Sequence, residues 1–334
     1  MKAAIFDAFG KPLVIGERPD PSPSPDEVVL RICRCGICGS DLHMTEDATF
    51  GLQGGEVIGH EFSGEVMEVG RNVSDIKPGD LVAAAPLKGC GRCAPCRAGE
   101  PAWCEQQMEL IGGGYAEYAA LTARQVRRLP ADVSLADGAL AEPLAVALHG
   151  LRRARVAPGE RVVVVGAGAI GLAVVFWARR LGAGAVVAVD LHDHQRDRAG
   201  ELGATDFVTS GPEMRERIEK ACGGLPDVVF ECVGKVGLID HCIDLVRPRG
   251  RVCVLGLCTG VDRLDSFRAI SKEVDVIMSV FFDMNEFAMS IEALDVGRYC
   301  PQTLVSDVVE LSDAPEAFEA LRQRTTQCKV LIAP

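Results

Sequence analysis

The stretch Arg161-Val-Val-Val-Val-Gly166-Ala-Gly168-Ala-Ile-Gly171 decides the fold of this chain. Its four consecutive valines predict a strand that is buried on both faces, which is typical of a parallel sheet. The strand leads into a G-x-G-x-x-G loop, and the uncharged run after the loop predicts a helix that ends near Arg180. A second buried strand, Ala185 to Val189, follows and is closed by Asp190. The order strand, turn, helix, strand predicts the start of a doubly wound α/β domain.

The glycines of this loop meet the requirements of a dinucleotide site. Gly166 permits the turn, Gly168 lets the backbone approach a pyrophosphate, and Gly171 allows the helix to pack closely. Free N–H groups at the helix start attract phosphates, and Asp190 comes nineteen residues after Gly171, where it can hydrogen-bond an adenosine ribose. The predicted cofactor-binding residues of this region are therefore Gly166, Gly168, Ile170, Gly171 and Asp190. The alternative is that the glycines only form turns and that Asp190 caps a helix.

Asp190 also bears on which dinucleotide binds. A carboxylate at this position repels the extra phosphate of NADP and accepts hydrogen bonds from the free ribose hydroxyls of NAD. NAD is therefore the predicted cofactor, with NADP less favoured. Arg196 and Arg198 follow closely and in principle offer partners to a 2′-phosphate, so NADP stays open as the alternative.

Further strands complete a sheet of six. They are predicted over residues 206–209, 227–231, 251–256 and 274–280, with helix-like stretches between most of them. In such a sheet the ligand lies at the carboxyl ends of the strands, so the loops Glu231–Gly234 and Leu255–Leu257 are expected to border the nicotinamide end. Leu257 is therefore a further predicted cofactor-binding residue. The cysteines near this sheet are predicted to be small core residues: Cys232, Cys242, Cys253 and Cys258.

Four closely spaced cysteines mark a metal site elsewhere in the chain. They follow the spacing C-x2-C-x2-C-x7-C at Cys90, Cys93, Cys96 and Cys104. One turn-rich segment of this kind wraps four thiolates around a tetrahedral Zn²⁺ and leaves no open position, so the predicted site is structural. An iron–sulfur cluster and disulfides are the alternatives. The glycines and prolines of the segment predict a loop without helix or strand.

The first part of the chain reads as mainly β, with strands expected over residues 28–33, 61–69, 81–85 and 116–121. Cys38, His60 and Glu142 come from three distant segments of it. One thiolate, one imidazole and one carboxylate form the kind of three-ligand set that leaves Zn²⁺ a vacant position. The alternatives are a buried thiol for Cys38, a core histidine for His60, and stabilisation of a helix N-terminus by Glu142.

Composition limits the class of protein. A chain of 334 residues suits two domains, and a net charge of −12 without a basic stripe disfavours nucleic acid as a partner. Fourteen cysteines without an apparent secretory signal predict a reducing, cytoplasmic location. The uncharged run from Val162 to Ala178 approaches a membrane-spanning length, but its glycines divide it, so no membrane span is expected.

With these motifs in this order, the chain resembles the zinc-dependent medium-chain dehydrogenase/reductase family, nearest the sorbitol, butanediol and threonine dehydrogenase branch. The resemblance covers nearly the whole length. The matching pieces are the C-G-x-C-G-S-D-x-H run ending at His43, the G-H-E-F-S-G run Gly59–Gly64, Pro78-Gly79-Asp80, the four-cysteine segment, Glu142-Pro143-Leu144 and Gly166–Gly171.

The resemblance implies a Rossmann sheet inserted between parts of a mainly-β, GroES-like catalytic domain. Residues 1–145 plus 283–334 are then the zinc-binding catalytic domain, and residues 146–282 the NAD-binding domain. The tail would return to the catalytic domain through a helix from Asp283 to Val296, a second stretch over residues 314–320 and a strand at Lys329–Ala333. Family members are usually homo-oligomers, so a dimer or tetramer is expected.

The resemblance also implies roles for single residues. Cys38, His60 and Glu142 would bind the catalytic zinc, with Glu61 beside the metal or exchanging as a ligand. Each chain would thus hold one catalytic and one structural Zn²⁺. Ser40 and His43 would relay the substrate proton to the surface through the cofactor ribose. A local turn hydrogen bond is the alternative for Ser40, and a structural loop contact for His43.

The predicted function is a zinc-dependent transfer of hydride between NAD and a secondary alcohol or polyol, or the matching ketone. The partner is therefore a small-molecule substrate. Two alternatives stay open: a carbonyl reductase that prefers NADPH, and a catalytically inactive scaffold protein that resembles the lens-crystallin relatives of the family. Intact Cys38, Ser40, His60 and Asp190 argue against the second alternative.

Overall fold

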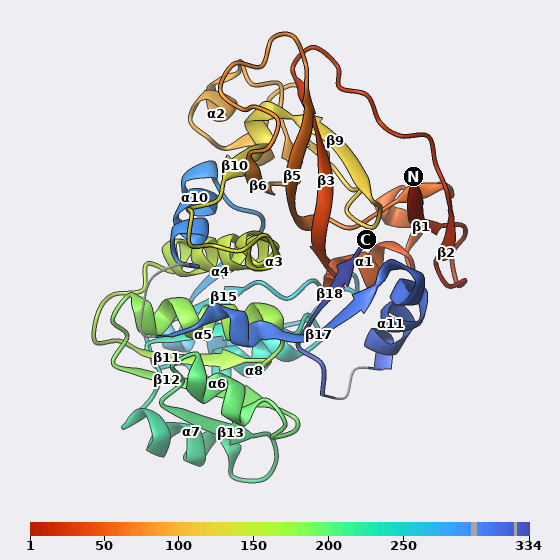
Figure 1. Cartoon of the computed structure of the whole chain (residues 1–334). Helices are drawn as coiled ribbons and strands as arrows, with labels where there is room; N and C mark the ends of the chain where they lie inside the picture. The colour runs from red at the N-terminus through yellow and green to blue at the C-terminus, as the bar shows by residue number, and fades with distance from the viewer. Residues whose placement is uncertain (295–298, 324–325) are drawn as a thin grey trace. The chain divides into compact units, whose positions relative to one another are not determined.

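The computed structural model describes residues 1–294, 299–323 and 326–334 (Figure 1). By their contacts the residues form two compact units. The first consists of Met1–Glu142, the described parts of Asp283–Val296, and the described parts of Val305–Pro334. The second consists of Pro143–Phe282 and the described part of Gly297–Leu304. The assignment of the zinc-binding and NAD-binding roles to residues 1–145 plus 283–334 and 146–282 stays a prediction.

The first unit is mainly β, as expected. Within the described residues its largest sheet has seven strands. Six follow the order β10-β6-β5-β3-β18-β17, and the seventh, β9, also pairs with β3. Figure 1 shows β3, β5 and β9 side by side, and β5 and β9 both run antiparallel to β3. These strands are β3 (Glu27–Gly36), β5 (Glu61–Val69), β6 (Leu81–Ala84), β9 (Tyr118–Thr122), β10 (Val126–Arg128), β17 (Val305–Glu310) and β18 (Lys329–Ala333).

Smaller elements surround this sheet. Two further sheets contain β1 (Lys2–Phe6), β2 (Val14–Glu17) and β4 (Glu56–Val57), and β7 (Leu87–Lys88) and β8 (Glu109–Leu110). The helices are α1 (Gly39–Met44), α2 (Ala94–Arg97), α3 (Leu135–Gly138), α10 (Met284–Glu292) and α11 (Ala314–Ala320), with 3-10 turns η1 (Ala48–Phe50), η2 (Pro101–Trp103), η3 (Ala123–Gln125), η5 (Leu311–Asp313) and η6 (Leu321–Gln323). Asp283 caps α10 in a capping box with Glu286, which explains why this helix begins where it does.

The second unit is the predicted doubly wound domain. Among the described residues, six parallel strands have the order β13-β12-β11-β14-β15-β16. They are β11 (Arg161–Val165), β12 (Ala185–Asp190), β13 (Asp206–Thr209), β14 (Val228–Glu231), β15 (Arg251–Val254) and β16 (Asp275–Met278). The helices are α4 (Ala141–Arg153, which begins in the first unit), α5 (Ala169–Arg180), α6 (Arg196–Glu201), α7 (Met214–Cys222), α8 (Leu238–Leu245) and α9 (Ser266–Lys272), with the 3-10 turn η4 (Pro301–Leu304).

The glycine loop shows why glycine is required between β11 and α5. Gly166 has φ +97°, and a Cβ there would lie 2.5 Å from the side chain of Val233. A Cβ on Gly171 would lie 1.8 Å from the carbonyl oxygen of Gly166, so α5 approaches the loop more closely than any other residue would allow. The valines of β11 are buried among those of β12 and β14, as expected for an inner parallel strand.

The structure differs from expectation in some details. The prediction that the four-cysteine segment has no helix is wrong, because α2 and η2 lie within it. Pro95 and Pro101 stand in the first turns of these short helices, where a missing N–H costs no hydrogen bond. Glu142 lies in the first turn of α4. Strand β17 was not predicted, and the predicted helix end at Val296 lies outside the described residues. Within the described ranges no helix is long and apolar enough to cross a membrane.

Candidate functional site

Helix α1 carries the first residues of the candidate metal centre. Cys38 precedes α1, and its backbone N–H donates to the Asp41 carboxylate at 3.1 Å. This closes the turn that the sequence C-G-S-D favours. The hydroxyl of Ser40 donates to the Cys38 sulfur at 3.1 Å and lies 3.5 Å from Nε2 of His60. The short helix thus places a thiol and a hydroxyl next to the imidazole that precedes β5.

Asp41 orients His60. Its carboxylate accepts from Nδ1 of His60 at 3.0 Å and from the hydroxyl of Tyr115 at 2.6 Å, and all three side chains are buried. The imidazole therefore turns its Nε2 toward Ser40 and Cys38, which is how carboxylate–histidine pairs prepare a metal ligand. Burial opposes a charge on His60, but the neighbouring Asp41 outweighs burial and raises the pKa of the imidazole well above its usual value.

The structure brings Cys38, His60 and Glu61 together. One ligand atom of each lies within 4.8 Å of the others. Glu142 lies outside this close group, although its carboxylate interacts electrostatically with His60 and Glu61. Burial raises the pKa of Glu142 to about 7, and no hydrogen bond or ion pair joins its side chain to another residue in the described part of the chain. A buried carboxylate without a partner is unfavourable unless a cation binds it.

The donors of this centre fit a zinc ion. Thiolate, imidazole and carboxylate are all ligands that Zn²⁺ takes in proteins. The carboxylate of Glu142, which has no hydrogen bond or ion pair in the described chain, and the Nε2 of His60 are the groups that a cation would bind. The role of these residues as ligands stays a prediction.

Among the described residues, His43 makes no contact with the candidate metal ligands like those that Ser40 makes with Cys38 and His60. It lies on α1, three positions after Ser40, with a half-buried side chain. Within the described residues no hydrogen bond joins its ring to another side chain. Of the two residues in the predicted proton relay, Ser40 contacts the thiol of Cys38. In the part of the chain that the structure describes, no hydrogen bond joins His43 to Ser40.

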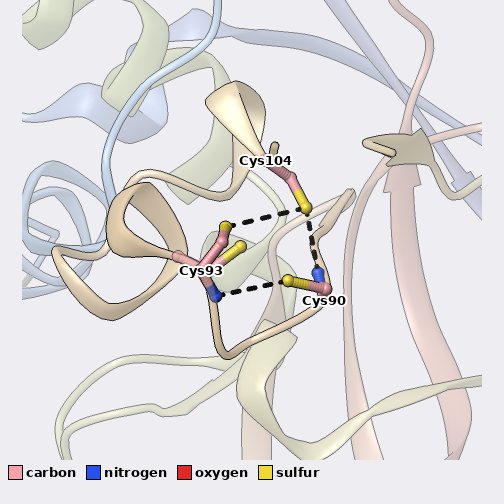
Figure 2. A group of neighbouring side chains, drawn as sticks. Cys90, Cys93 and Cys104 are labelled. Atoms are coloured by element: carbon pink, nitrogen blue, oxygen red, sulfur yellow. Dashed lines mark hydrogen bonds between the residues drawn. The ribbon is translucent and has the colours of Figure 1, made fainter. Parts of the chain in front are cut away.

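The cysteines of the four-cysteine segment also lie close together. Figure 2 shows the sulfur atoms of Cys90, Cys93 and Cys104 turned toward one another, and the four sulfurs including that of Cys96 lie within 4.8 Å of each other. Backbone N–H groups donate to them, from Cys90 to the sulfur of Cys104 at 3.2 Å and from Cys93 to that of Cys90 at 3.4 Å. The backbone N–H of Cys90 lowers the pKa of Cys104 to about 6, so this thiol is prepared as a thiolate ligand.

The glycine loop of the second unit is tied to Asp190. The Asp190 carboxylate accepts from the backbone N–H of Ala167 and from that of Leu191, both at 2.7 Å. Arg196 donates to the carbonyl of Phe207 and stacks on its ring, while Arg198 donates to the carbonyl of Thr303. Both arginines therefore have protein partners already, which reduces their availability for a 2′-phosphate.

The two later loops named as cofactor-binding approach each other. A Cβ on Gly234 would lie 2.3 Å from the carbonyl oxygen of Leu257. The loops after β14 and β15 thus meet at the carboxyl ends of the strands, where ligands of doubly wound sheets bind. Cys242 and Cys253 are buried core residues as expected, whereas Cys232 and Cys258 are only partly buried.

Comparison with known proteins identifies the family. Residues 24–131 match the family described as alcohol dehydrogenase GroES-like domain, and residues 169–295 match zinc-binding dehydrogenase. The L-idonate 5-dehydrogenase of Vitis vinifera is 34% identical over 327 residues, which cover 93% of this chain and 89% of that relative. The chain belongs to the zinc-dependent medium-chain dehydrogenases. Its relatives place the dehydrogenase in the sorbitol-like branch, so it is a polyol or alcohol oxidoreductase, and the predicted fold class is confirmed.

Two more relatives support this assignment. The sorbitol dehydrogenase of Gallus gallus is 34% identical over 323 residues, covering 93% of this dehydrogenase and 90% of the relative. A zinc-binding dehydrogenase of Sinorhizobium meliloti 1021, solved with bound NADP, superposes with a TM-score of 0.89 at 30% identity. The match covers 100% of this chain and 99% of that one. The family match and this relative support binding of a nicotinamide dinucleotide, and they do not decide between NAD and NADP.

Sequence reasoning missed three buried residues of this dehydrogenase that support the centre. Asp41 and Tyr115 orient His60, and Lys329 donates to both carboxylate oxygens of Glu61. Asp41 lies in the C-G-x-C-G-S-D-x-H run that ends at His43, between two residues already named as candidates, so a role for it beside the metal ligands could have been predicted. A lysine opening the otherwise apolar strand Lys329–Ala333 was the available signal for Lys329, because such a residue is rarely buried without a partner.

Proposed function

We propose that this dehydrogenase oxidises a secondary hydroxyl group of a polyol or related alcohol, with NAD as hydride acceptor, and reduces the matching ketone in reverse. The observation that carries the proposal is the group of Cys38, His60 and Glu61 within 4.8 Å of one another, next to the unpaired carboxylate of Glu142. Cys38, His60 and Glu142 would hold a catalytic zinc ion. When bound, such an ion acts as a Lewis acid that lowers the pKa of a coordinated hydroxyl.

The chain's own residues prepare this chemistry. Asp41 fixes the ring of His60, so that Nε2 is the ligand atom. Burial of His60, Glu61 and Glu142 strengthens the electrostatic interactions among them. Ser40 stands next to the Cys38 sulfur, where its hydroxyl would accept the proton of a substrate hydroxyl, and His43, three positions later on α1, would be the base that receives it.

Asp190 supports the choice of NAD. Its carboxylate ends β12 and accepts from the backbone of the loop that would receive the pyrophosphate, so its negative charge is fixed where it would face the adenosine ribose of a bound dinucleotide. Arg196 and Arg198 are committed to carbonyl groups of the protein. The four sulfurs of Cys90, Cys93, Cys96 and Cys104 would hold the second, structural zinc ion, because four thiolates leave no position for substrate.

The oligomeric state and location belong to the same proposal. Strand β16 is at the edge of its sheet, and the neighbouring α9 exposes Phe267 (78%) and Ile270 (73%). An edge strand with free backbone groups pairs with its own copy about a two-fold axis, so a homo-oligomer built on this face is expected. Fourteen free cysteines suit the reducing cytoplasm.

The direct test is a substrate panel. The purified dehydrogenase, with its metal content measured, is assayed on linear polyols, 2,3-diols, sugar acids and simple secondary alcohols with NAD and with NADP. The expected result is oxidation of at least one secondary alcohol, a preference for NAD, and two zinc ions per chain. A zinc-loaded protein that binds neither cofactor and oxidises nothing would favour the scaffold alternative instead.

A further inference from the structure

A cavity of about 850 Å³ lies in the first unit, beside the four-cysteine segment. Its walls come from that segment, from η3 and β10, and from the loop over residues 72–76. All the residues that line it belong to the first unit. None of the candidate ligands of the catalytic metal and none of the predicted cofactor-binding residues is among them. A cavity of this size can hold a small molecule, and the candidate active site does not use it.

The cavity is rich in arginine although the whole chain is acidic, with a net charge of −12. Both aspartates in its wall already accept a hydrogen bond from a neighbouring side chain. Arg128 is paired with Asp80, but in the described part of the chain the other three arginines have no acidic partner. The charged residues of the wall are Arg97, Arg124, Arg127, Arg128, Asp26 and Asp75.

Arg127 has unused hydrogen-bond donors at the cavity. Its side chain is half-buried, and Nη1 donates to the carbonyl oxygens of Arg124 and Val126 at 3.0 and 2.9 Å. Nε and Nη2 make no hydrogen bond to the described residues. Burial lowers the pKa of Arg127, and no neighbouring carboxylate opposes this effect. An anion in the cavity would therefore supply both a counter-charge and hydrogen-bond acceptors.

The four-cysteine segment leaves room for the guanidinium group of Arg124. A Cβ on Gly91 would lie 1.2 Å from Nη1 of Arg124, so only glycine allows this contact. The turn that carries Arg124 is fixed by Gln125, which is 2% exposed and forms a capping box with Thr122. Arg124 and Arg127 are thus held by a short turn and the strand that follows it, as the side chains of a binding site need to be.

We propose that this cavity binds a small molecule with two or more oxyanion groups, phosphate or carboxylate, held by Arg124 and Arg127 with Arg97 as a third cationic contact. The planar fork of a guanidinium group matches the oxygen atoms of both kinds of group. The net negative charge of the chain disfavours a nucleic acid as the ligand. The site lies outside the residues proposed for hydride transfer, so it adds a second binding function to this unit.

The test is calorimetric titration of the zinc-loaded enzyme with 2,3-bisphosphoglycerate and with tricarballylate at constant ionic strength. Neither probe has a free hydroxyl group that the enzyme could oxidise, and saturating NADH keeps both away from the glycine loop. We expect at least one probe to bind at one site per chain. In the variant Arg124→Gln with Arg127→Gln its affinity should fall at least about tenfold, because charge-assisted hydrogen bonds are lost. The affinity for NADH should stay unchanged.

The matched control is Arg71→Gln with Arg92→Gln. It removes the same charge from two exposed arginines of the first unit that do not line the cavity, so the affinity should stay within about twofold. If the variant with both Arg124 and Arg127 replaced does not fold, Arg124→Gln alone decides. It leaves the carbonyl group that Arg127 binds in place, and it should still weaken binding about threefold or more.

Four outcomes would overturn the inference. They are the absence of binding by both probes, an equal response to acetate at the same ionic strength, an equal loss of affinity in the control variant, and unchanged affinity after replacement of Arg124 and Arg127. Binding of 2,3-bisphosphoglycerate alone would identify phosphate as the ligand group, and binding of tricarballylate alone would identify carboxylate.

Two further measurements on the variant Arg124→Gln with Arg127→Gln separate the ligand site from other uses of the arginines. Light scattering should give the wild-type mass, and a lower mass would assign the cavity to a second copy of the chain. Metal analysis should give the wild-type zinc content. Loss of the zinc ion proposed for the four cysteines would mean that the arginines balance the charge of the thiolates, and it would also overturn the inference.

Discussion

The hydroxyl of Ser40 and the ring of His43 stand on the same turn of helix, yet only Ser40 contacts the candidate centre. If His43 completes the path of the proton, His43→Ala should slow turnover mainly below neutral pH, where a base is most needed. The measurement is the pH–rate profile of kcat for wild type and variant, with His241→Ala on α8 as a control. A profile with unchanged shape would remove His43 from the relay.

Asp190 is the second residue whose role can be isolated. Asp190→Asn keeps an oxygen that can accept from Ala167 N–H but removes the charge that repels a 2′-phosphate. The ratio of kcat/KM for NAD over NADP should fall by about tenfold, which corresponds to about 1.4 kcal/mol. The matched control is Asp193→Asn, three positions later. An unaltered ratio would mean that residues other than Asp190 select the cofactor.

At the scale of elements, Asp227 joins the start of β14 to two arginines. Its carboxylate accepts from Nε of Arg161 at 3.0 Å and from Nε of Arg247 at 2.6 Å. Burial alone would raise the pKa of Asp227, but hydrogen bonds from Arg161 and Arg247 outweigh burial and lower it. The resulting stabilisation is therefore complete above the unfolded value of about 3.9 and is lost as the pH falls below it.

Asp227→Asn should consequently destabilise the second unit by about 2 kcal/mol at neutral pH, because hydrogen bonds to a charged group are lost. The difference from wild type should shrink as the pH falls below about 4, because the unfolded wild-type chain then binds a proton at Asp227 that the folded carboxylate, with its lowered pKa, does not. Chemical denaturation followed across this pH range measures both effects. A difference that stays constant with pH would assign the loss to packing and not to charge.

Elements differed in how far they could be predicted. The boundaries of β5, β13 and β18 follow from local patterns of β-branched residues, and the six-stranded sheet follows from its repeated strands and turns. Strand β17 has the partly polar, exposed pattern of an edge and so lacked a hydrophobic signal. The pairing of Lys329 with Glu61 joins residues 268 positions apart, and no local pattern in one sequence reports such a contact.

At the scale of the whole molecule, the exposed face of α9 and β16 bears on assembly. Phe267→Glu combined with Ile270→Glu places like charges on both sides of a two-fold contact, so the proposed homo-oligomer should dissociate toward monomers. Light scattering coupled to size-exclusion chromatography measures the mass. Val308→Glu, which also replaces an exposed apolar residue (52% exposed) but in the first unit, serves as the control. An unchanged mass in the double variant would place the contact elsewhere.

The position of Lys329 also matters for how the first unit tolerates the loss of β18. Strand β18 lies between β3 and β17, and through Lys329 it also reaches Glu61 at the start of β5, on the far side of β3. Proteolytic removal of β18 would therefore leave a buried carboxylate beside Cys38 and His60 without its counter-charge. A clipped enzyme is thus expected to lose the candidate metal centre together with the strand.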